Sequence, residues 1–411
     1  MAVKIANTTR RGFLKTVAAI GTGVVIDRSG AQAANTQMKA SPDKWIVPKR
    51  PFGNTGVQVP ILSLGGMFNT GRNLLLLKQA VKWGVTYWDT AARYEYWGSE
   101  TGIGEYFTKY PEDRQKIFLV SKAYTLDPSR LDHYLDASLH NLKTDYIDLY
   151  FIHSVDYADD LKPKEFRRWA EKAKSSGKIK FFGFSTHKNM PENLLEGAKL
   201  GFIDGIMSTY NYRFMLNDDM KQGIEACAKA GVGLTAMKTQ AVMEWGHRVG
   251  DESAEALKLT ERFLKKGFSE QQARLKVVLE DTQIASVCSQ MENMTFLKAN
   301  VEAAVSKEKL SDNDRRILET YAHNTTSHYC SGCATICESA VKGESPIADT
   351  IRCLMYKRCY GDKEFAVDEF KRIPETIRSQ LTTLDYAKAE NLCPRNIPIG
   401  QIIGEAVHEL S

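Results

Sequence analysis

Three short apolar segments, each ending on one ionisable residue, restrict the fold of this chain more than any other feature. The segments and their final residues are 85–88 with Asp89, 117–121 with Lys122, and 146–152 with His153. Short runs rich in β-branched and aromatic residues are typical of buried strands. In a barrel of parallel strands, the C-terminal ends of the strands share one rim, where catalytic residues lie. The sequence therefore predicts that a carboxylate, an ammonium and an imidazole meet at such a rim.

Tyr94 follows Asp89 by five residues and is expected on the loop after the first of these strands. A tyrosine hydroxyl has an unperturbed pKa of about 10, and a nearby ammonium such as Lys122 lowers it. A lysine buried beside the tyrosine keeps its charge only if a carboxylate holds it, which is the role expected of Asp89. His153 could bind a carbonyl oxygen by hydrogen bonding. Together these groups suit the donation of a proton to an oxygen that becomes negative as hydride reaches its carbon.

The sequence around these residues resembles the aldo/keto reductase family. The matching stretches are 84–94, 98–100, 138–153, 177–180 and 183–185, within a resemblance that covers roughly residues 45–300. In that family an aspartate, a tyrosine, a lysine and a histidine form the catalytic tetrad, which here falls on Asp89, Tyr94, Lys122 and His153. The resemblance implies hydride transfer between a nicotinamide cofactor and an aldehyde, ketone or alcohol, with Tyr94 as the general acid or base.

Eight segments have the composition of strands, and segments of helical periodicity separate them. The strand segments are 61–67, 85–89, 117–122, 146–152, 179–185, 203–210, 231–237 and 284–289. The helical segments include 74–83, 131–142, 164–174 and 218–230. Eight strand–helix units predict an α/β fold, a parallel (β/α)8 TIM barrel rather than a doubly wound sheet. The resemblance implies that a hairpin at 51–60 plugs the bottom of the barrel.

The sequence shows no glycine-rich dinucleotide fingerprint after the first strand. This agrees with the resemblance, because aldo/keto reductases bind nicotinamide cofactors without a Rossmann fold. The cofactor-binding residues that the resemblance implies are Ser185, Asn211, Lys238 and Asn300. Met207 stands where the family has a glutamine, and no cation falls in register with the site for the 2′-phosphate. NADP and NAD are therefore both candidates, and loss of the cofactor is the alternative.

Residues 1–34 resemble a twin-arginine export signal and are left out of the predicted fold. A pair of arginines precedes a weakly apolar run, 16–26, that is too short to span a bilayer, and 31–33 offers a small-residue cleavage site. We therefore expect export through the twin-arginine translocase and a periplasmic location. Residues 35–50 are predicted to be a linker, and residues 51–306 are predicted to form the barrel.

The last predicted domain, 307–411, is helical and carries six of the eight cysteines of the chain. It resembles the ferredoxin-like C-terminal domains attached to some aldo/keto reductases. A Cys-x2-Cys spacing lets two thiolates face one metal centre, and a later Cys-Pro resembles the closing residue of a ferredoxin motif. The predicted ligands of one [4Fe–4S] cluster are Cys330, Cys333, Cys337 and Cys393.

This motif departs from the ferredoxin pattern, because three residues instead of two separate Cys333 from Cys337 and a long insertion, 338–392, precedes Cys393. Two other interpretations therefore stay open. One is a degenerate domain without a cluster, whose cysteines form disulfides in an oxidising compartment. The other is a zinc site with four thiolate ligands.

The charge of the chain argues against nucleic-acid binding, because its formal net charge is +5 and no long basic run is present. The leading hypothesis is an exported oxidoreductase that acts on small carbonyl or alcohol substrates, with a periplasmic electron-transfer partner for the cluster. The alternative is a catalytically inactive barrel that serves as a scaffold for an iron–sulfur electron-transfer or interaction domain. Substrate identity and oligomeric state do not follow from the sequence.

Overall fold

The computed structural model describes residues 45–240 and 268–411, which belong to one compact unit. The predicted export signal and most of the predicted linker lie outside the described residues. Within the linker segment, Trp45 and Val47 are buried in the core, so the end of this segment packs with the barrel. In the two described ranges, no helix combines the length and the apolar composition that crossing a membrane requires.

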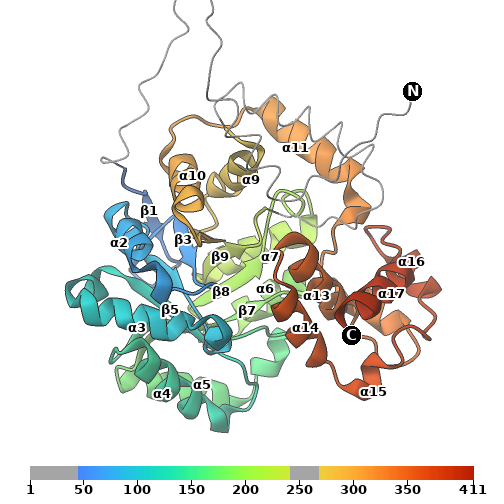
Figure 1. Cartoon of the computed structure of the whole chain (residues 1–411), viewed down its shortest axis with the longest axis horizontal. Helices are drawn as coiled ribbons and strands as arrows, with labels where there is room; N and C mark the ends of the chain where they lie inside the picture. The colour runs from blue at the N-terminus through green and yellow to red at the C-terminus, as the bar shows by residue number, and fades with distance from the viewer. Residues whose placement is uncertain (1–44, 241–267) are drawn as a thin grey trace, which may run out of the picture. The chain divides into compact units, whose positions relative to one another are not determined.

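Eight parallel strands close into a barrel, as the sequence predicts (Figure 1). In chain order they are β3 Leu62–Gly65, β4 Tyr87–Asp89, β5 Phe118–Ala123, β6 Ile147–Ile152, β7 Ile179–Thr186, β8 Gly205–Thr209, β9 Gly233–Met237 and β10 Ser286–Gln290. Successive strands are neighbours, and β10 closes the ring by pairing with both β3 and β9. The predicted (β/α)8 barrel is therefore confirmed.

The helices of the barrel pack outside the ring of strands. They are α2 Leu74–Lys82, α3 Ser99–Lys109, α4 Leu131–Leu142, α5 Lys164–Ser175, α6 Met190–Lys199, α7 Asp218–Ala230, α9 Glu270–Leu279 and α10 Met294–Val305. Short 3-10 helices are η3 Gly71–Asn73, η4 Ala92–Trp97, η5 Pro111–Lys116, η6 Pro128–Arg130, η7 Ala158–Leu161, η8 Thr326–His328 and η9 Glu338–Ala340. Local sequence sets several helix starts. Asn217, for example, caps α7 by accepting a hydrogen bond from the Met220 N–H.

A hairpin closes the N-terminal end of the barrel, as the resemblance implies. Its strands, β1 Lys49–Pro51 and β2 Gln58–Pro60, pair antiparallel, and Phe52 between them is fully buried in the barrel interior. Gly205 and Gly233, the first residues of β8 and β9, leave room for the Phe52 ring. A Cβ atom would lie 2.8 Å from the ring at Gly205 and 2.5 Å from it at Gly233, too close for any larger residue. The plugged end is opposite the rim where β4 ends at Asp89.

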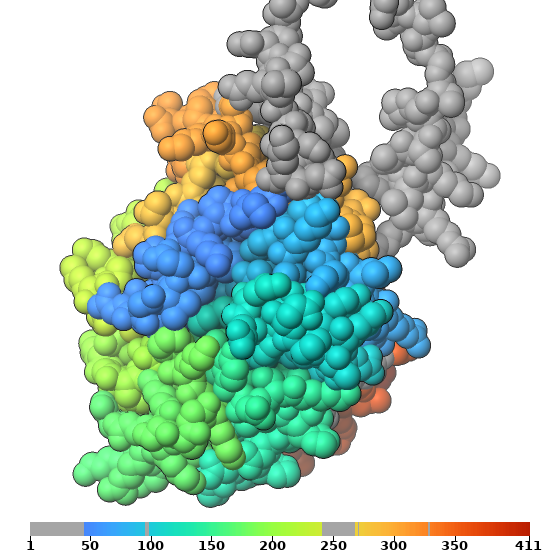
Figure 2. All heavy atoms as spheres, turned by 90° about the vertical axis from the view of Figure 1, so that its left-hand side faces the viewer, coloured from blue at the N-terminus to red at the C-terminus, as the bar shows by residue number. Residues whose placement is uncertain are grey.

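The C-terminal domain is helical, as the sequence predicts. Its helices are α11 Asp312–Asn324, α12 Ala334–Cys337, α13 Ile347–Cys359, α14 Lys363–Lys371, α15 Glu375–Arg378, α16 Ala387–Leu392 and α17 Ile399–Leu410. The central helix, α13, packs against both α14 and α17. Figure 1 shows α13 to α17, in red, gathered on the side of the barrel near β7 and β8, whereas α11, in orange, lies apart from them. The view turned by 90° in Figure 2 shows a face built from barrel segments, with the red C-terminal domain visible only at its edge.

Candidate active site at the rim of the barrel

Asp89 and Lys122 form an ion pair inside the rim. Asp89 is the last residue of β4, and Lys122 is the next-to-last residue of the adjacent strand β5. The Lys122 Nζ donates to the Asp89 Oδ1 at 2.6 Å and to the Thr90 carbonyl oxygen at 2.7 Å. Only 1% and 4% of the two side chains is exposed. Burial raises the pKa of Asp89, and the attraction of Lys122 offsets part of this increase.

Tyr94 and His153 lie beside this ion pair. Tyr94 belongs to η4, on the loop after β4, and the Lys122 Nζ lies 5.2 Å from the centre of its ring. His153 directly follows β6. Its backbone N–H donates to the Ala123 carbonyl oxygen at 2.8 Å, and this bond continues the β5–β6 ladder. The rings of Tyr94 and His153 meet edge to face, with centroids 5.8 Å apart. The structure therefore brings the four predicted tetrad residues together.

The pKa of Tyr94 lies well above its usual value of 10, because the residue is surrounded by protein and the Asp89 carboxylate is near. The sequence-based expectation that Lys122 lowers this pKa is not met. Burial and the Asp89 carboxylate raise this pKa by more than Lys122 can lower it. An unperturbed tyrosine is already protonated at pH 7, and this shift keeps the Tyr94 hydroxyl protonated.

His153 is buried, and its Nδ1 atom has no hydrogen-bond partner among the described residues. Burial and the positive charge of Lys122 hold its pKa well below 6.5. A neutral imidazole has one N–H donor and one acceptor nitrogen. His153 can therefore hold a carbonyl oxygen without carrying a charge of its own.

The predicted cofactor residues lie at the rim, and they differ in how many of their hydrogen-bonding groups stay available for a ligand. Ser185 accepts a hydrogen bond from the Ser154 N–H at 3.0 Å, so its own hydroxyl hydrogen stays available for an amide oxygen. Met237, at the end of β9, is half-buried and offers an apolar face. Asn211 is fully buried, and its amide donates to the Lys238 carbonyl oxygen and the Tyr329 hydroxyl. The Ser185 hydroxyl and the apolar Met237 side chain therefore suit a bound nicotinamide. The amide of Asn211 is already used in hydrogen bonds within the protein.

Two other predicted cofactor residues lie on either side of these. The Asn300 side chain donates to the Ser289 Oγ at 2.9 Å, near the end of β10. The Lys238 Nζ lies over two rings of the C-terminal domain, 4.9 Å from the centre of Tyr356 and 5.4 Å from that of Tyr360. Burial, with a smaller effect of Arg352, lowers the pKa of Lys238 to about 7. Lys238 thus faces the C-terminal domain.

The C-terminal domain touches the rim through a short loop, 329–332. The Asn189 N–H donates to the Gly332 carbonyl oxygen at 2.8 Å. Gly332 has a φ of 70°, and a Cβ there would lie 2.4 Å from the His187 carbonyl oxygen. Only glycine allows this backbone to approach β7 so closely.

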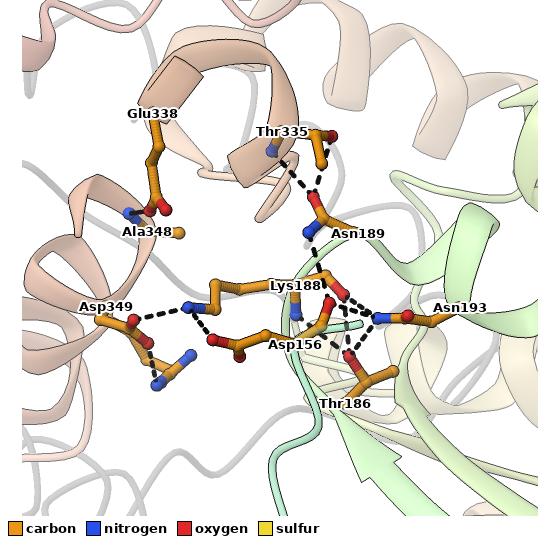
Figure 3. A network of polar contacts seen from close by, with 10 residues as sticks. Asp156, Thr186, Lys188, Asn189, Asn193, Thr335, Glu338, Ala348 and Asp349 are labelled. Carbon is orange, nitrogen blue, oxygen red and sulfur yellow. Dashed lines mark hydrogen bonds and ion pairs between the residues drawn. The ribbon is translucent and has the colours of Figure 1, made fainter. Parts of the chain in front are cut away.

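A polar network joins the same rim to α12 and α13 (Figure 3). The Lys188 Nζ binds Asp349 of α13 at 2.7 Å and Asp156 at 2.6 Å. Asn189 accepts hydrogen bonds from the backbone N–H and the hydroxyl of Thr335 on α12. On the other side of the rim, Arg93 forms an ion pair with Glu369 of α14. These contacts fix the C-terminal domain over the candidate active site.

A small cavity of about 20 Å³ lies between the rim and the C-terminal domain. Its lining residues are His187, Met190, Thr209, Lys238, Tyr329, Cys330, Ser331, Gly332, Ala348, Arg352 and Met355. A volume of this size holds about one water molecule. Sequence reasoning missed Arg352, because nothing local places a residue of the C-terminal domain at the rim, and it did not single out His187, which directly follows β7. The signal available was the spacing of Arg352, Met355 and Tyr356, which lie along one face of a helix.

The predicted cluster ligands lie near one another in the C-terminal domain. The pKa of Cys330 is raised, that of Cys333 is raised to about 11 and that of Cys337 to about 12, mainly by burial and in part by the neighbouring thiols, Cys393 among them. All eight cysteines are free thiols. Within the described ranges, no group of three or more His, Cys, Asp or Glu side chains could hold a metal ion. Neither the zinc site nor the [4Fe–4S] cluster gains support from this, and both stay predictions.

Comparison with known proteins identifies relatives of the barrel. Residues 63–319 match the model of the Aldo/keto reductase family. L-galactose dehydrogenase of Arabidopsis thaliana is 23% identical over 302 residues, which cover 66% of this chain and 93% of that protein. The uncharacterized oxidoreductase YqkF of Bacillus subtilis is 25% identical over 305 residues, covering 66% of this chain and 96% of that protein. The aldo-keto reductase AKR11C1 from Bacillus halodurans, solved in its holo form, shares the fold with a TM-score of 0.56 and 23% identity, over 67% of this chain and 96% of that one.

Proposed function

Because this chain belongs to the aldo/keto reductase family, we propose that it is an oxidoreductase that transfers hydride between a nicotinamide cofactor and a small carbonyl or alcohol substrate. Members of the family act on small-molecule carbonyl substrates and generally use NADP(H). The observation that carries the proposal is the buried Lys122–Asp89 ion pair next to the Tyr94 ring. His153 lies against the same ring.

In the proposed reaction, the Tyr94 hydroxyl exchanges a proton with the substrate oxygen. Its raised pKa keeps it protonated, so it can donate as the carbonyl oxygen becomes negative. The Lys122 ammonium, held by Asp89, stabilises the phenolate that is left. The neutral His153 orients the carbonyl oxygen. In the direction of alcohol oxidation, the same groups move the proton the opposite way.

A bound nicotinamide would supply or accept the hydride. Ser185 would bind its carboxamide, Met237 would contact its ring, and Asn300 would lie at the adenosine end. Neither NADP nor NAD is favoured by these residues. Loop 329–332 and α13 cover this part of the rim, so we propose that the cofactor enters when they move and that it is released slowly. Slow release would suit an exported enzyme that carries its cofactor along.

Export through the twin-arginine translocase and a periplasmic location belong to the same proposal. The support is the arginine pair and the short apolar run within residues 1–34. Replacing both arginines by lysine should retain the protein in the cytoplasmic fraction of a bacterial host. Unchanged export of this variant would exclude the pathway.

We also propose that Cys330, Cys333, Cys337 and Cys393 bind one [4Fe–4S] cluster that exchanges electrons with a periplasmic partner. Their ferredoxin-like spacing and their mutual electrostatic effects support this set. Cys330 also lines the cavity at the rim, which would place a bound cluster beside the reaction site. Iron analysis of anaerobically purified protein tests the assignment. Serine at Cys393 should remove the iron, whereas serine at the buried barrel residue Cys227 should not.

The second candidate function is a barrel without cofactor that serves as a scaffold for the C-terminal domain. It is favoured by Met207 in place of a hydrogen-bonding residue and by the small cavity at the rim. Nucleotide extracted from the denatured protein decides between the two. A stoichiometric nicotinamide supports the oxidoreductase, and its absence after loading with NADPH and NADH supports the scaffold.

The role of Tyr94 is tested by Tyr94→Phe, with Tyr124→Phe as a matched control. Both rings pack against His153, with centroids 5.8 and 5.9 Å away, and each variant loses one hydroxyl. Loss of the general acid should lower the rate of carbonyl reduction by about 10²- to 10⁴-fold, while the control should keep most of its activity. Equal rates for Tyr94→Phe and the wild type would refute the assignment.

A further inference from the structure

The charged side chains that line the cavity between the rim and the C-terminal domain are all basic. Its lining contains Lys238, Arg352 and His187 but, in the part of the chain that the structure describes, no aspartate or glutamate. Lys238 and His187 follow strands of the barrel, whereas Arg352 comes from α13. Two cations from different domains therefore face one small space.

Lys238 has no carboxylate partner among the described residues. Its ammonium rests on the rings of Tyr356 and Tyr360, which attract a cation but cannot accept a full hydrogen bond as an oxygen does. The residue has a φ of 57°, a left-handed conformation that is uncommon outside glycine. Lys238 is half-buried, and a ligand that brings a negative charge would stabilise its charged form.

Arg352 and His187 add further donors. The guanidinium of Arg352 binds Asp349, and this contact leaves most of its five N–H donors unused. Asp349 is shared with Lys188, so its charge does not neutralise Arg352 alone. The His187 Nδ1 atom is buried and has no hydrogen-bond partner within the described ranges. Each of these groups can bind an oxygen of an anionic ligand.

The cavity lies at the same rim as the tetrad. His187, which lines the cavity, follows β7, and His153 follows the neighbouring strand β6. The ends of these two strands are joined by the hydrogen bond from the Ser154 N–H to the Ser185 Oγ at 3.0 Å. A volume that holds about one water molecule admits one oxygen of a carboxylate rather than a pyrophosphate, although the sequence places Lys238 among the cofactor residues.

We propose that Arg352, Lys238 and His187 form a subsite for the carboxylate of the substrate, so that the enzyme acts on small oxo acids or hydroxy acids. This inference rests on the proposed function. It assigns to the C-terminal domain a direct part in substrate selection. An oxyanion could also come from a phosphate of the cofactor, and the experiment below separates the two sources.

The test compares the holoenzyme of the full chain with Arg352→Gln and Lys238→Met. Reduction of pyruvate and glyoxylate is measured beside that of their uncharged methyl esters. Loss of one charged hydrogen bond should raise KM for the acids by about 10- to 100-fold and leave the esters within about threefold. Lys357→Gln is the matched control, since Lys357 lies on the same helix and binds Glu409 instead. Equal losses for acids and esters would overturn the proposal.

A binding measurement keeps this test independent of turnover. Oxalate, which has no carbonyl to reduce, is titrated calorimetrically into Tyr94→Phe holoenzyme with and without Arg352→Gln. Weaker oxalate binding in the double variant, at unchanged nicotinamide content, supports the carboxylate subsite. A fall in nicotinamide content with unchanged oxalate affinity would instead assign these residues to the cofactor. Should no carbonyl be reduced at all, the proposed function fails, and the oxalate titration still decides the subsite.

Discussion

At the scale of single residues, the candidate site depends on two charges kept together away from water. Asp89 and Lys122 are almost completely buried, and Asp89 has its pKa raised by that burial. A buried ion pair adds little net stability over an apolar pair, but removing one partner leaves the other charge unpaired. The pair is therefore better explained by the chemistry of Tyr94 than by stability.

Lys122→Met should lower the free energy of unfolding by about 3–5 kcal/mol, because it leaves a buried carboxylate without a partner. Chemical denaturation monitors the change. Lys172→Met is the control, since Lys172 binds Asp132 at the surface with 72% of its side chain exposed, and such pairs contribute about 0–1 kcal/mol. Replacing Asp89 by Leu in the Lys122→Met background should restore part of the loss. A cost as small as that of the control would contradict the buried pair.

Two histidines, the buried His153 and the half-buried His187, give the stability a defined pH dependence. Burial is the main cause that holds the pKa of His153 and of His187 well below 6.5. Below that pH the unfolded chain binds protons at these positions and the folded chain does not, so the free energy of unfolding falls as the pH drops. It should be insensitive to these residues above about pH 7. Urea unfolding between pH 8 and 5.5 measures the slope, which should flatten in a His153→Phe, His187→Phe double variant.

At the scale of secondary-structure elements, loop 329–332 joins the two parts of the molecule through backbone contacts. Its fit depends on Gly332, with its positive φ and its close approach to His187. The side-chain network of Lys188, Asp349 and Thr335 supports the same contact (Figure 3). Substitutions in this loop should therefore alter the packing of the rim residues that it contacts.

Gly332→Ala should destabilise the protein by more than about 1 kcal/mol, because alanine resists the left-handed backbone and its Cβ meets the His187 carbonyl oxygen. Gly404→Ala, by contrast, should stabilise the protein. Gly404 lies inside α17 with open space around its Cβ position, so alanine should stabilise the helix by about 0.5–1 kcal/mol. Thermal unfolding of both variants tests the pair. Similar melting temperatures for the two would speak against the close packing of this loop.

Local sequence patterns predict the elements well. The strand ending at Asp89 and the helices 131–142 and 218–230 all appear as expected, because periodicity acts within a few residues. The contact of Asn189 with Thr335 joins residues 146 positions apart, and that of Lys188 with Asp349 joins residues 161 apart. Patterns within a short segment do not reveal contacts between residues so far apart in the chain. The position of the C-terminal domain at the rim was therefore not predictable.

At the scale of the whole molecule, the C-terminal domain packs against the rim of the barrel that carries the tetrad. Residues of α13 and of loop 329–332 line the cavity at this rim, and Glu369 of α14 binds Arg93, the residue before Tyr94 in the chain. Specificity in such barrels lies above the rim of the strands. The C-terminal domain therefore takes the place that loops alone have in a simple barrel.

Hydride transfer at this rim can be followed directly with an isotope. The full chain is incubated with NADPH or NADH that carries deuterium at the reactive C4 position of the nicotinamide, together with pyruvate and a panel of neutral carbonyls. The wild type should form an alcohol product with one deuterium on the former carbonyl carbon, and Tyr94→Phe should form much less of it. A folded wild-type protein that binds neither nucleotide and transfers no deuterium to any of these carbonyls would contradict hydride transfer at this rim.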